Sequence, residues 1–138
     1  MIERYELNAI CPLWQLHDEE IMDIVIKDNS LIMTFETLIH PRDIHKSCTL
    51  IFEGFRDMIY DVLFIVAQID SELNISGKEY YLQEFIEFTR ELSRPLMAVN
   101  RIMSGYEVVV IHGCLLGNHY PIPCSVVVNA KVMYYDWK

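Results

Sequence analysis

HDEEIMDIVIKDNSLIMTFET, residues His17–Thr37, has the pattern of a β-hairpin with an acidic segment in front of it. Asp28 and Asn29 favour a two-residue turn, because both residue types tolerate the positive φ that tight hairpin turns require. With this turn, Ile24 lies opposite Met33. The other facing pairs are Met22 with Phe35, Ile26 with Leu31, and Lys27 with Ser30. Because side chains alternate along a strand, the three apolar pairs share one face, and the sequence predicts that this face belongs to the core.

Three more stretches alternate well enough to predict strands. These are Ser47–Phe55, Tyr106–Leu116 and Cys124–Tyr135, the last as one continuous strand. Gly54 inside the first stretch predicts a bulge or a close backbone approach. The faces expected to be buried carry Cys48, Leu50 and Phe52 in the first stretch, and Cys124, Val126, Val128, Ala130, Val132 and Tyr134 in the last.

Three segments fit more than one kind of element. Ile2–Leu7 suits a short strand or a helical turn, and Leu96–Met103 suits a strand or a short helix. Met58–Ile69 is rich in β-branched and aromatic residues, although its apolar residues also recur at helical spacing. We expect a strand there, because these residue types fit a pleated surface. The other two segments stay open.

Ser76–Ser93 has the strongest helical pattern in the chain. Ser76 and Glu79 have the spacing of a capping box, and Pro95 disfavours helix at the residue before it. The apolar stripe consists of Tyr81, Leu82, Phe85, Ile86, Thr89 and Leu92. With the strands, it predicts an α+β fold: a mostly antiparallel β-sheet with one main α-helix packed on a sheet face, in a single domain over residues 1–138.

The composition favours a compact cytosolic protein. The chain has 138 residues, of which 52% are hydrophobic and 22% charged. Its longest apolar run, Val62–Ala67, is far shorter than the roughly 20 residues of a membrane span. The N-terminus lacks the basic and apolar regions of a signal peptide. Four cysteines without CxxC spacing are expected to be reduced, which fits a cytoplasmic location without membrane attachment.

The net charge of the chain indicates which kind of partner it could bind. Twenty acidic residues against eleven Lys and Arg give a net charge of −9. This opposes nucleic-acid binding, in which affinity comes mostly from basic side chains. An acidic surface instead suits a basic protein partner, because complementary charge speeds encounter.

Two groups of residues could carry chemistry. Cys114, His119 and Cys124 are five residues apart and follow His112, and thiolates with imidazoles can bind zinc. We expect no metal or cofactor, because the two cysteines lie on different predicted strands and lack the tight spacing of structural zinc sites. Alternation places His112 and Cys114 on one face, which we expect to point inward.

The second group lies in front of the hairpin. His17 stands beside Asp18, Glu19 and Glu20, and a histidine near carboxylates could act as a general base. No nucleophile motif or glycine-rich phosphate loop accompanies it, which favours a protein that is not an enzyme. The alternative is a small-ligand or metal-dependent enzyme that uses His17 and Asp18, or the region of His112, Cys114, His119 and Cys124.

Partner binding is the interpretation that these observations favour. Trp14 lies close to the acidic segment, and interface cores are enriched in Trp. The predicted partner-binding residues are Trp14, His17, Asp18, Glu19 and Glu20. The apolar last predicted strand is also compatible with a homo-oligomer.

A resemblance supports the same interpretation. The stretches LWQLHDEEIMDIVIKDNSLIMTFE, CTLIFEGF and CSVVVNAKVMYYDW resemble small uncharacterised bacterial proteins, some of which are similar to immunity proteins encoded beside polymorphic toxins. The resemblance covers about half of the chain and is a pattern of strands. It implies a non-enzymatic inhibitor whose acidic face blocks a toxin. The matching positions are Trp14, Asp18, Glu19 and Glu20, and no catalytic residue is carried over.

Overall fold

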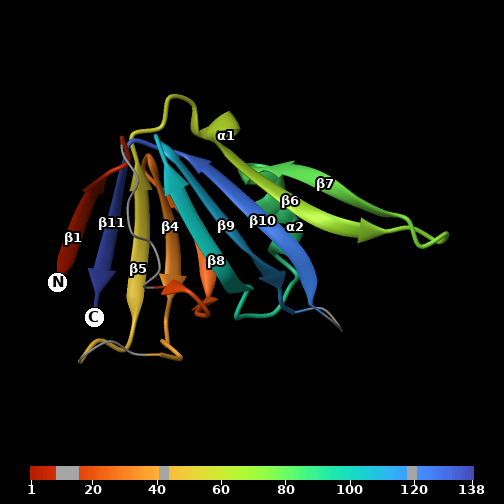
Figure 1. The fold of residues 1–138 in the computed structure, drawn as a ribbon, viewed down its shortest axis with the longest axis horizontal. Coiled ribbons are helices and arrows are strands. Elements are labelled where there is room, and N and C mark those ends of the chain that lie inside the picture. The colour runs from red at the N-terminus through yellow and green to blue at the C-terminus, as the bar shows by residue number, and fades with distance from the viewer. Residues whose placement is uncertain (9–15, 41–43, 118–120) are drawn as a thin grey trace.

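The strands form two antiparallel sheets that lie face to face (Figure 1) in a computed structural model that describes residues 1–8, 16–40, 44–117 and 121–138. The five-stranded sheet has the order β1 (Ile2–Glu6), β11 (Val132–Trp137), β5 (Cys48–Glu53), β4 (Ser30–Phe35) and β3 (Asp23–Lys27). The six-stranded sheet has the order β2 (Glu20–Ile21), β8 (Met97–Gly105), β9 (Val108–Leu115), β10 (Ile122–Asn129), β6 (Val62–Ile69) and β7 (Ile75–Tyr81). Two short helices, α1 (Met58–Asp61) and α2 (Leu82–Thr89), complete the described elements.

The predicted hairpin is confirmed as β3 and β4. Ile24 pairs with Met33, and the register continues through Ile26 with Leu31 to Lys27 with Ser30. Asp28 has a φ of 56°, the left-handed conformation expected of the turn. Two details differ. The predicted pair of Met22 with Phe35 is not part of the register, which begins with Asp23 and Thr34. Ile26 is 38% exposed rather than buried, because β3 is the edge strand of its sheet among the described residues.

The other strand predictions are largely confirmed. Ser47–Phe55 contains β5, and a Cβ added to Gly54 would lie 2.7 Å from the Lys131 Cβ, which explains the glycine. Ile2–Leu7 and Leu96–Met103, which fitted two kinds of element, form β1 and most of β8. Met58–Ile69 is a strand only from residue 62 onward, because its first turn is α1.

The helix predicted over Ser76–Ser93 is wrong in its first third, and the single main helix is not confirmed. Residues 75–81 form β7, in which Tyr80 pairs with Phe64 of β6. Helix α2 begins only after Tyr81, whose amide donates to the Glu84 carboxylate at 3.3 Å. The Phe85 ring then stacks on Phe64 with centroids 3.6 Å apart. Strand pairing therefore overrides the capping-box pattern.

The continuous strand predicted over Cys124–Tyr135 is also wrong. The chain forms β10 in one sheet, crosses at Ala130 and Lys131, and continues as β11 in the other. The crossing shifts the alternation by one residue, so Val132 and Tyr134 face outward instead of inward. The buried side chains are Cys124, Val126, Val128 and Ala130 before the crossing, and Met133, Tyr135 and Trp137 after it.

Inward side chains of both sheets form one hydrophobic cluster. The β6–β7 hairpin extends beyond the rest of the molecule (Figure 1), and its Ile69, Leu73 and Ile75 are exposed. None of the helices in the described part of the chain has the length and apolar character needed to cross a membrane.

Candidate functional site

The acidic segment in front of the hairpin is divided between the interior and the surface. Glu19 is only 1% exposed, and its carboxylate accepts hydrogen bonds from the amides of Ile39 at 2.6 Å and His40 at 2.8 Å. These residues follow β4, whereas Glu19 precedes β2 in the other sheet. The carboxylate therefore ties the two sheets together and is not presented to a partner.

His17 and Asp18 are the exposed members of the segment. The His17 Nδ1 lies 3.1 Å from the Asp18 Oδ2, and the Asp18 amide donates to the Val99 carbonyl at 2.9 Å. Glu20 pairs with Ala98 and is half-buried. Trp14 lies outside the described residues. Only His17 and Asp18 of the five predicted residues are thus shown side by side at the surface.

The residues weighed as metal ligands in the sequence do not all face the same way. His112 and Cys114 face outward on β9, so the expectation that they point inward is wrong. Cys124 faces inward, and burial raises the pKa of its thiol to about 12. His119 lies outside the described residues. Within the described ranges, no group of three or more His, Cys, Asp or Glu side chains could hold a metal ion.

His112 does have one close polar partner. Its Nδ1 lies 2.6 Å from the Ser125 Oγ on the adjacent strand. A serine activated as a nucleophile needs a base that a third group orients, commonly a carboxylate. The residues next to this pair in the sheet register are Arg101 and Ile65, and neither is a carboxylate. The contact with Ser125 orients the His112 ring, and the sheet register places no carboxylate beside the pair.

A surface that the sequence did not predict lies where the end of β3 meets the two helices. There the chain forms an apolar groove with a volume of about 350 Å³. We call it the aromatic groove, because Tyr60 and Tyr81 meet edge to face in it with ring centroids 5.4 Å apart. Its lining residues are Ile26, Met58, Ile59, Tyr60, Tyr81, Leu82, Gln83 and Glu84.

The exposed side chains at this groove are held by a fixed backbone. Asp57 accepts a hydrogen bond from the Ile59 amide at 3.1 Å, and Asp61 accepts from the amides of Arg56 and Asp57 at 2.8 and 2.9 Å. Ile59 and Tyr60 are each 63% exposed, and no residue of α1 is buried. Because two carboxylates already hold the turn, little ordering remains to be lost when a partner binds these side chains.

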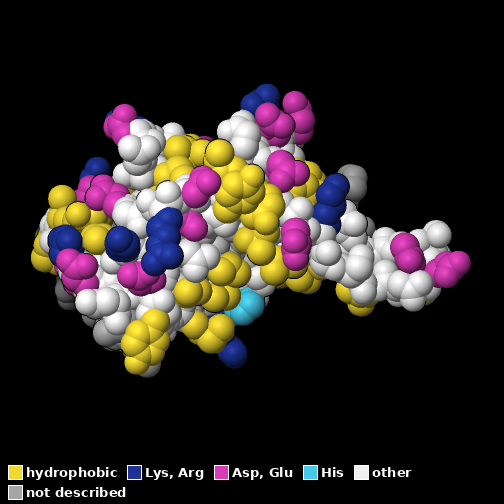
Figure 2. Space-filling model, turned by 90° about the horizontal axis from the view of Figure 1, so that it is seen from above, with side chains coloured by type: hydrophobic (Ala, Val, Ile, Leu, Met, Phe, Trp, Pro, Cys, Tyr) yellow, Lys and Arg dark blue, Asp and Glu magenta, His cyan; other side chains and the backbone are white. Residues whose placement is uncertain are grey.

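Glu84 places a carboxylate in the lining of the groove, and Asp57 and Asp61 belong to the turn that carries Ile59 and Tyr60. Figure 2 looks onto this end of the molecule and shows hydrophobic side chains gathered near its middle, with Asp and Glu side chains around them. Residues 56–61 and 82–91, which contain the two helices, hold five carboxylates and two cations. The acids are Asp57, Asp61, Glu84, Glu87 and Glu91, and the cations are Arg56 and Arg90.

Little in the sequence pointed to this groove. Its members come from β3, from the turn before β6 and from the start of α2, and only the tertiary fold brings them together. The one available signal was the start of Met58–Ile69, where Ile59 and Tyr60 stand together between acids instead of alternating with polar residues. Comparison with known protein families, curated proteins and solved structures found no match for this chain.

Proposed function

We propose that this protein is a non-enzymatic binding module that holds a basic segment of a partner protein in the aromatic groove. The observation that carries the proposal is the exposure of Ile59 and Tyr60 on a turn that Asp57 and Asp61 fix in place. Core packing does not account for these side chains, because α1 buries none of its residues. Exposed aromatic clusters rimmed by charge are typical of interaction sites.

The chemistry of the groove defines the partner. Tyrosine supplies a large apolar surface with few rotatable bonds, so it contributes strongly to interface cores. The carboxylates around it attract Lys and Arg and repel acidic surfaces, and the net charge of −9 acts in the same direction over longer distances. A partner segment with an apolar side chain flanked by basic residues fits both features.

An immunity-type inhibitor of the cytosol is the specific form of this proposal. The strand layout described above resembles such proteins, and inhibition by a bound partner needs no catalytic residue. The proposed surface differs from the acidic segment at His17–Glu20, because Glu19 is buried while Ile59 and Tyr60 are exposed. The target would then be a basic toxin domain encoded by a neighbouring gene.

The test measures the affinity for the purified product of the adjacent gene. Tyr60→Ala should weaken binding at least about tenfold, since loss of an interface tyrosine commonly costs more than 1 kcal/mol. Its unfolding midpoint should stay unchanged, because Tyr60 is exposed. Tyr106→Ala is the matched control: Tyr106 is an exposed tyrosine at another turn, and its loss should leave the affinity unchanged.

The charge contribution needs a separate variant. Glu87→Gln with Glu91→Gln removes two exposed carboxylates from α2 and the segment that follows it. Association should become slower and less sensitive to salt, while dissociation changes little. Absence of binding by the wild-type protein at low salt, or equal losses for Tyr60→Ala and Tyr106→Ala, would overturn the proposal.

A further inference from the structure

The outward face of the six-stranded sheet is unusually apolar. Three rows of side chains cross β8, β9, β10, β6 and β7 on this face. The first row is Met103, Val110, Val127, Leu63 and Tyr81. The middle row is Arg101, His112, Ser125, Ile65 and Glu79, and the third consists of Ala98, Cys114, Pro123, Ala67 and Gly77.

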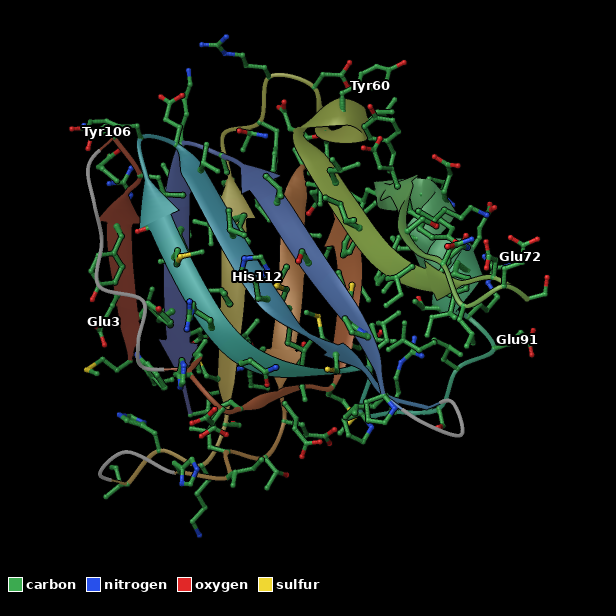
Figure 3. All side chains as sticks on the ribbon, turned by 45° about the vertical axis from the view of Figure 1, so that its right-hand side comes forward. Glu3, Tyr60, Glu72, Glu91, Tyr106 and His112 are labelled. Atoms are coloured by element: carbon green, nitrogen blue, oxygen red, sulfur yellow. The ribbon has the colours of Figure 1, made fainter. Side chains whose placement is uncertain are left out.

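This face has no cover within the described part of the chain. Figures 1 and 3 show it toward the viewer, with the labelled His112 near its centre and no described helix or strand over it. An antiparallel sheet that faces water normally places polar side chains outward. Only Arg101 and Glu79 among these fifteen positions are charged, although the chain has 31 Asp, Glu, Lys and Arg residues.

We propose that this face is the interface of a homodimer, in which a second copy packs its own six-stranded sheet against the first. The sheet register supplies the charge complementarity. Arg101 and Glu79 lie at opposite ends of one row, connected by the pairings through His112, Ser125 and Ile65. The two charges of opposite sign are therefore placed symmetrically about Ser125, the middle residue of the row.

This placement selects one kind of two-fold axis. An axis parallel to the strands, passing beside Ser125, brings Arg101 of each copy opposite Glu79 of the other. The same axis sets His112 against Ile65. A two-fold axis that lies between the sheets and runs perpendicular to the strands would instead place Arg101 opposite Arg101 and Glu79 opposite Glu79, so like charges would meet. Sheets packed face to face lie about 10 Å apart, a distance that long side chains such as Arg can span.

The area of the face is sufficient for a dimer. With strands about 4.8 Å apart and outward residues about 6.7 Å apart along each strand, fifteen positions cover about 500 Å² on each copy. Both copies together bury about 1,000 Å², which is the lower limit for a specific interface. This estimate treats the face as flat, and protruding side chains add to the buried area. Tyr81 belongs to both the aromatic groove and this face, whereas Ile59 and Tyr60 lie outside the fifteen positions, so a variant of Tyr60 separates the dimer from the proposed function.

The experiment compares molar masses across a range of protein concentrations by light scattering after size exclusion. The wild type should reach twice the monomer mass of 16.3 kDa. Ile65→Asp should remain folded by circular dichroism, because this side chain faces outward, and should run as a monomer. Ile51→Asp is the matched control: Ile51 occupies the central outward position of the five-stranded sheet, and its variant should stay dimeric.

A charge exchange tests the symmetry with residues that tolerate substitution. Arg101→Glu and Glu79→Arg should each weaken dimerisation at least tenfold, and the double variant should restore most of it. Wild type at monomer mass at every concentration would overturn the proposal, as would a dimer that survives Ile65→Asp. Failure of the double variant to recover would overturn the strand-parallel axis. Tyr60→Ala should leave the mass unchanged, which separates this result from that of the proposed function.

Discussion

The outer faces of the two sheets differ although their inner faces are alike. Fifteen outward positions cross the five-stranded sheet, and six of them carry charged side chains: Arg4, Glu6, Asp23, Lys27, Glu53 and Asp136. Of the fifteen outward positions on β8, β9, β10, β6 and β7, only Arg101 and Glu79 are charged, and Glu20 of the short edge strand β2 lies beside these positions. Both sheets alternate, and the central strands of both bury their inward side chains. Burial in the core explains the inward residues of both sheets. Contact with water explains the charged outward residues of the five-stranded sheet, but it does not explain the apolar outward residues of the six-stranded sheet.

Two adjacent residues of β4 give the largest expected effect. Met33 is fully buried and Ile32 faces outward. Met33→Asp places a carboxylate in the core, at a cost comparable to the whole stability of a domain, about 5–15 kcal/mol. We expect Met33→Asp to be unfolded by circular dichroism and Ile32→Asp to unfold cooperatively in urea. A cooperative transition for Met33→Asp would show that inward positions do not carry the stability.

Glu19 gives the next largest effect, because it joins the two sheets. Glu19→Ala removes the buried carboxylate that accepts hydrogen bonds from the amides of Ile39 and His40, which should cost about 1.5–3 kcal/mol. His17→Ala removes an exposed contact with Asp18 and should change the free energy of unfolding by less than about 0.5 kcal/mol. Urea denaturation of the two variants measures the difference. Equal losses would contradict the structural role of Glu19.

The sequence predicted those parts of the fold that local chemistry decides. The register of Ile24 with Met33 follows from a turn that needs only Asp28 and Asn29. The segment around Ser76 and Glu79 shows the limit of such reasoning. Its helical spacing is real, but pairing with β6 buries Tyr80 against the core and leaves the capping box unused. Contacts between distant segments decided that element, and no local pattern reveals them.

The crossing at Ala130 and Lys131 could not be predicted for a similar reason. Neither residue breaks a strand, so the apolar alternation seemed continuous from Cys124 to Tyr135. The structure holds the crossing through backbone hydrogen bonds, from the Ala130 amide to Glu107 and from the Lys131 amide to Glu53. The same limit applied to the prediction of the candidate functional site. The acidic segment was visible in the sequence, whereas the aromatic groove depends on three distant segments.

One buried cysteine in each sheet allows a test by pH. Burial raises the pKa of Cys48 in β5 and of Cys124 in β10 to about 12. An unfolded thiol titrates near 8.5, so only the unfolded state loses protons as the pH rises above that value. The stability contributed by each protonated thiol is therefore full below pH 8.5 and is lost between about pH 8.5 and 12.

The measurement is the free energy of unfolding in urea at pH 7.5 and at pH 10. Each thiol should contribute about 2 kcal/mol to the loss of stability at pH 10. Cys48→Ala and Cys124→Ala should each flatten the pH dependence by that amount. Cys114→Ala, which removes an outward thiol, is the control. If the free energy of unfolding depends on pH equally in Cys124→Ala and the wild type, the Cys124 thiol is accessible to water in the folded protein.

A change in the turn between β8 and β9 gives the smallest expected effect on stability. Asp28 suits its left-handed φ, whereas Tyr106 and Glu107 joining β8 and β9 have φ values of 47° and 69° that their side chains disfavour. Tyr106→Asn with Glu107→Gly supplies the residues that such turns prefer and should stabilise the protein by about 1 kcal/mol. Urea denaturation detects this change. A loss of stability would mean that the Tyr106 and Glu107 side chains stabilise the turn.

The position of β11 has a consequence for how the chain folds. Strands β3, β4 and β5 follow one another in sequence, so they can pair as soon as they are made. Strand β11 lies between β5 and β1, which begins 130 residues before it. Closing so long a loop is slow, and folding rates fall as contacts become more distant in sequence. We therefore expect refolding in which the β3–β5 meander forms early and the insertion of β11 limits the rate.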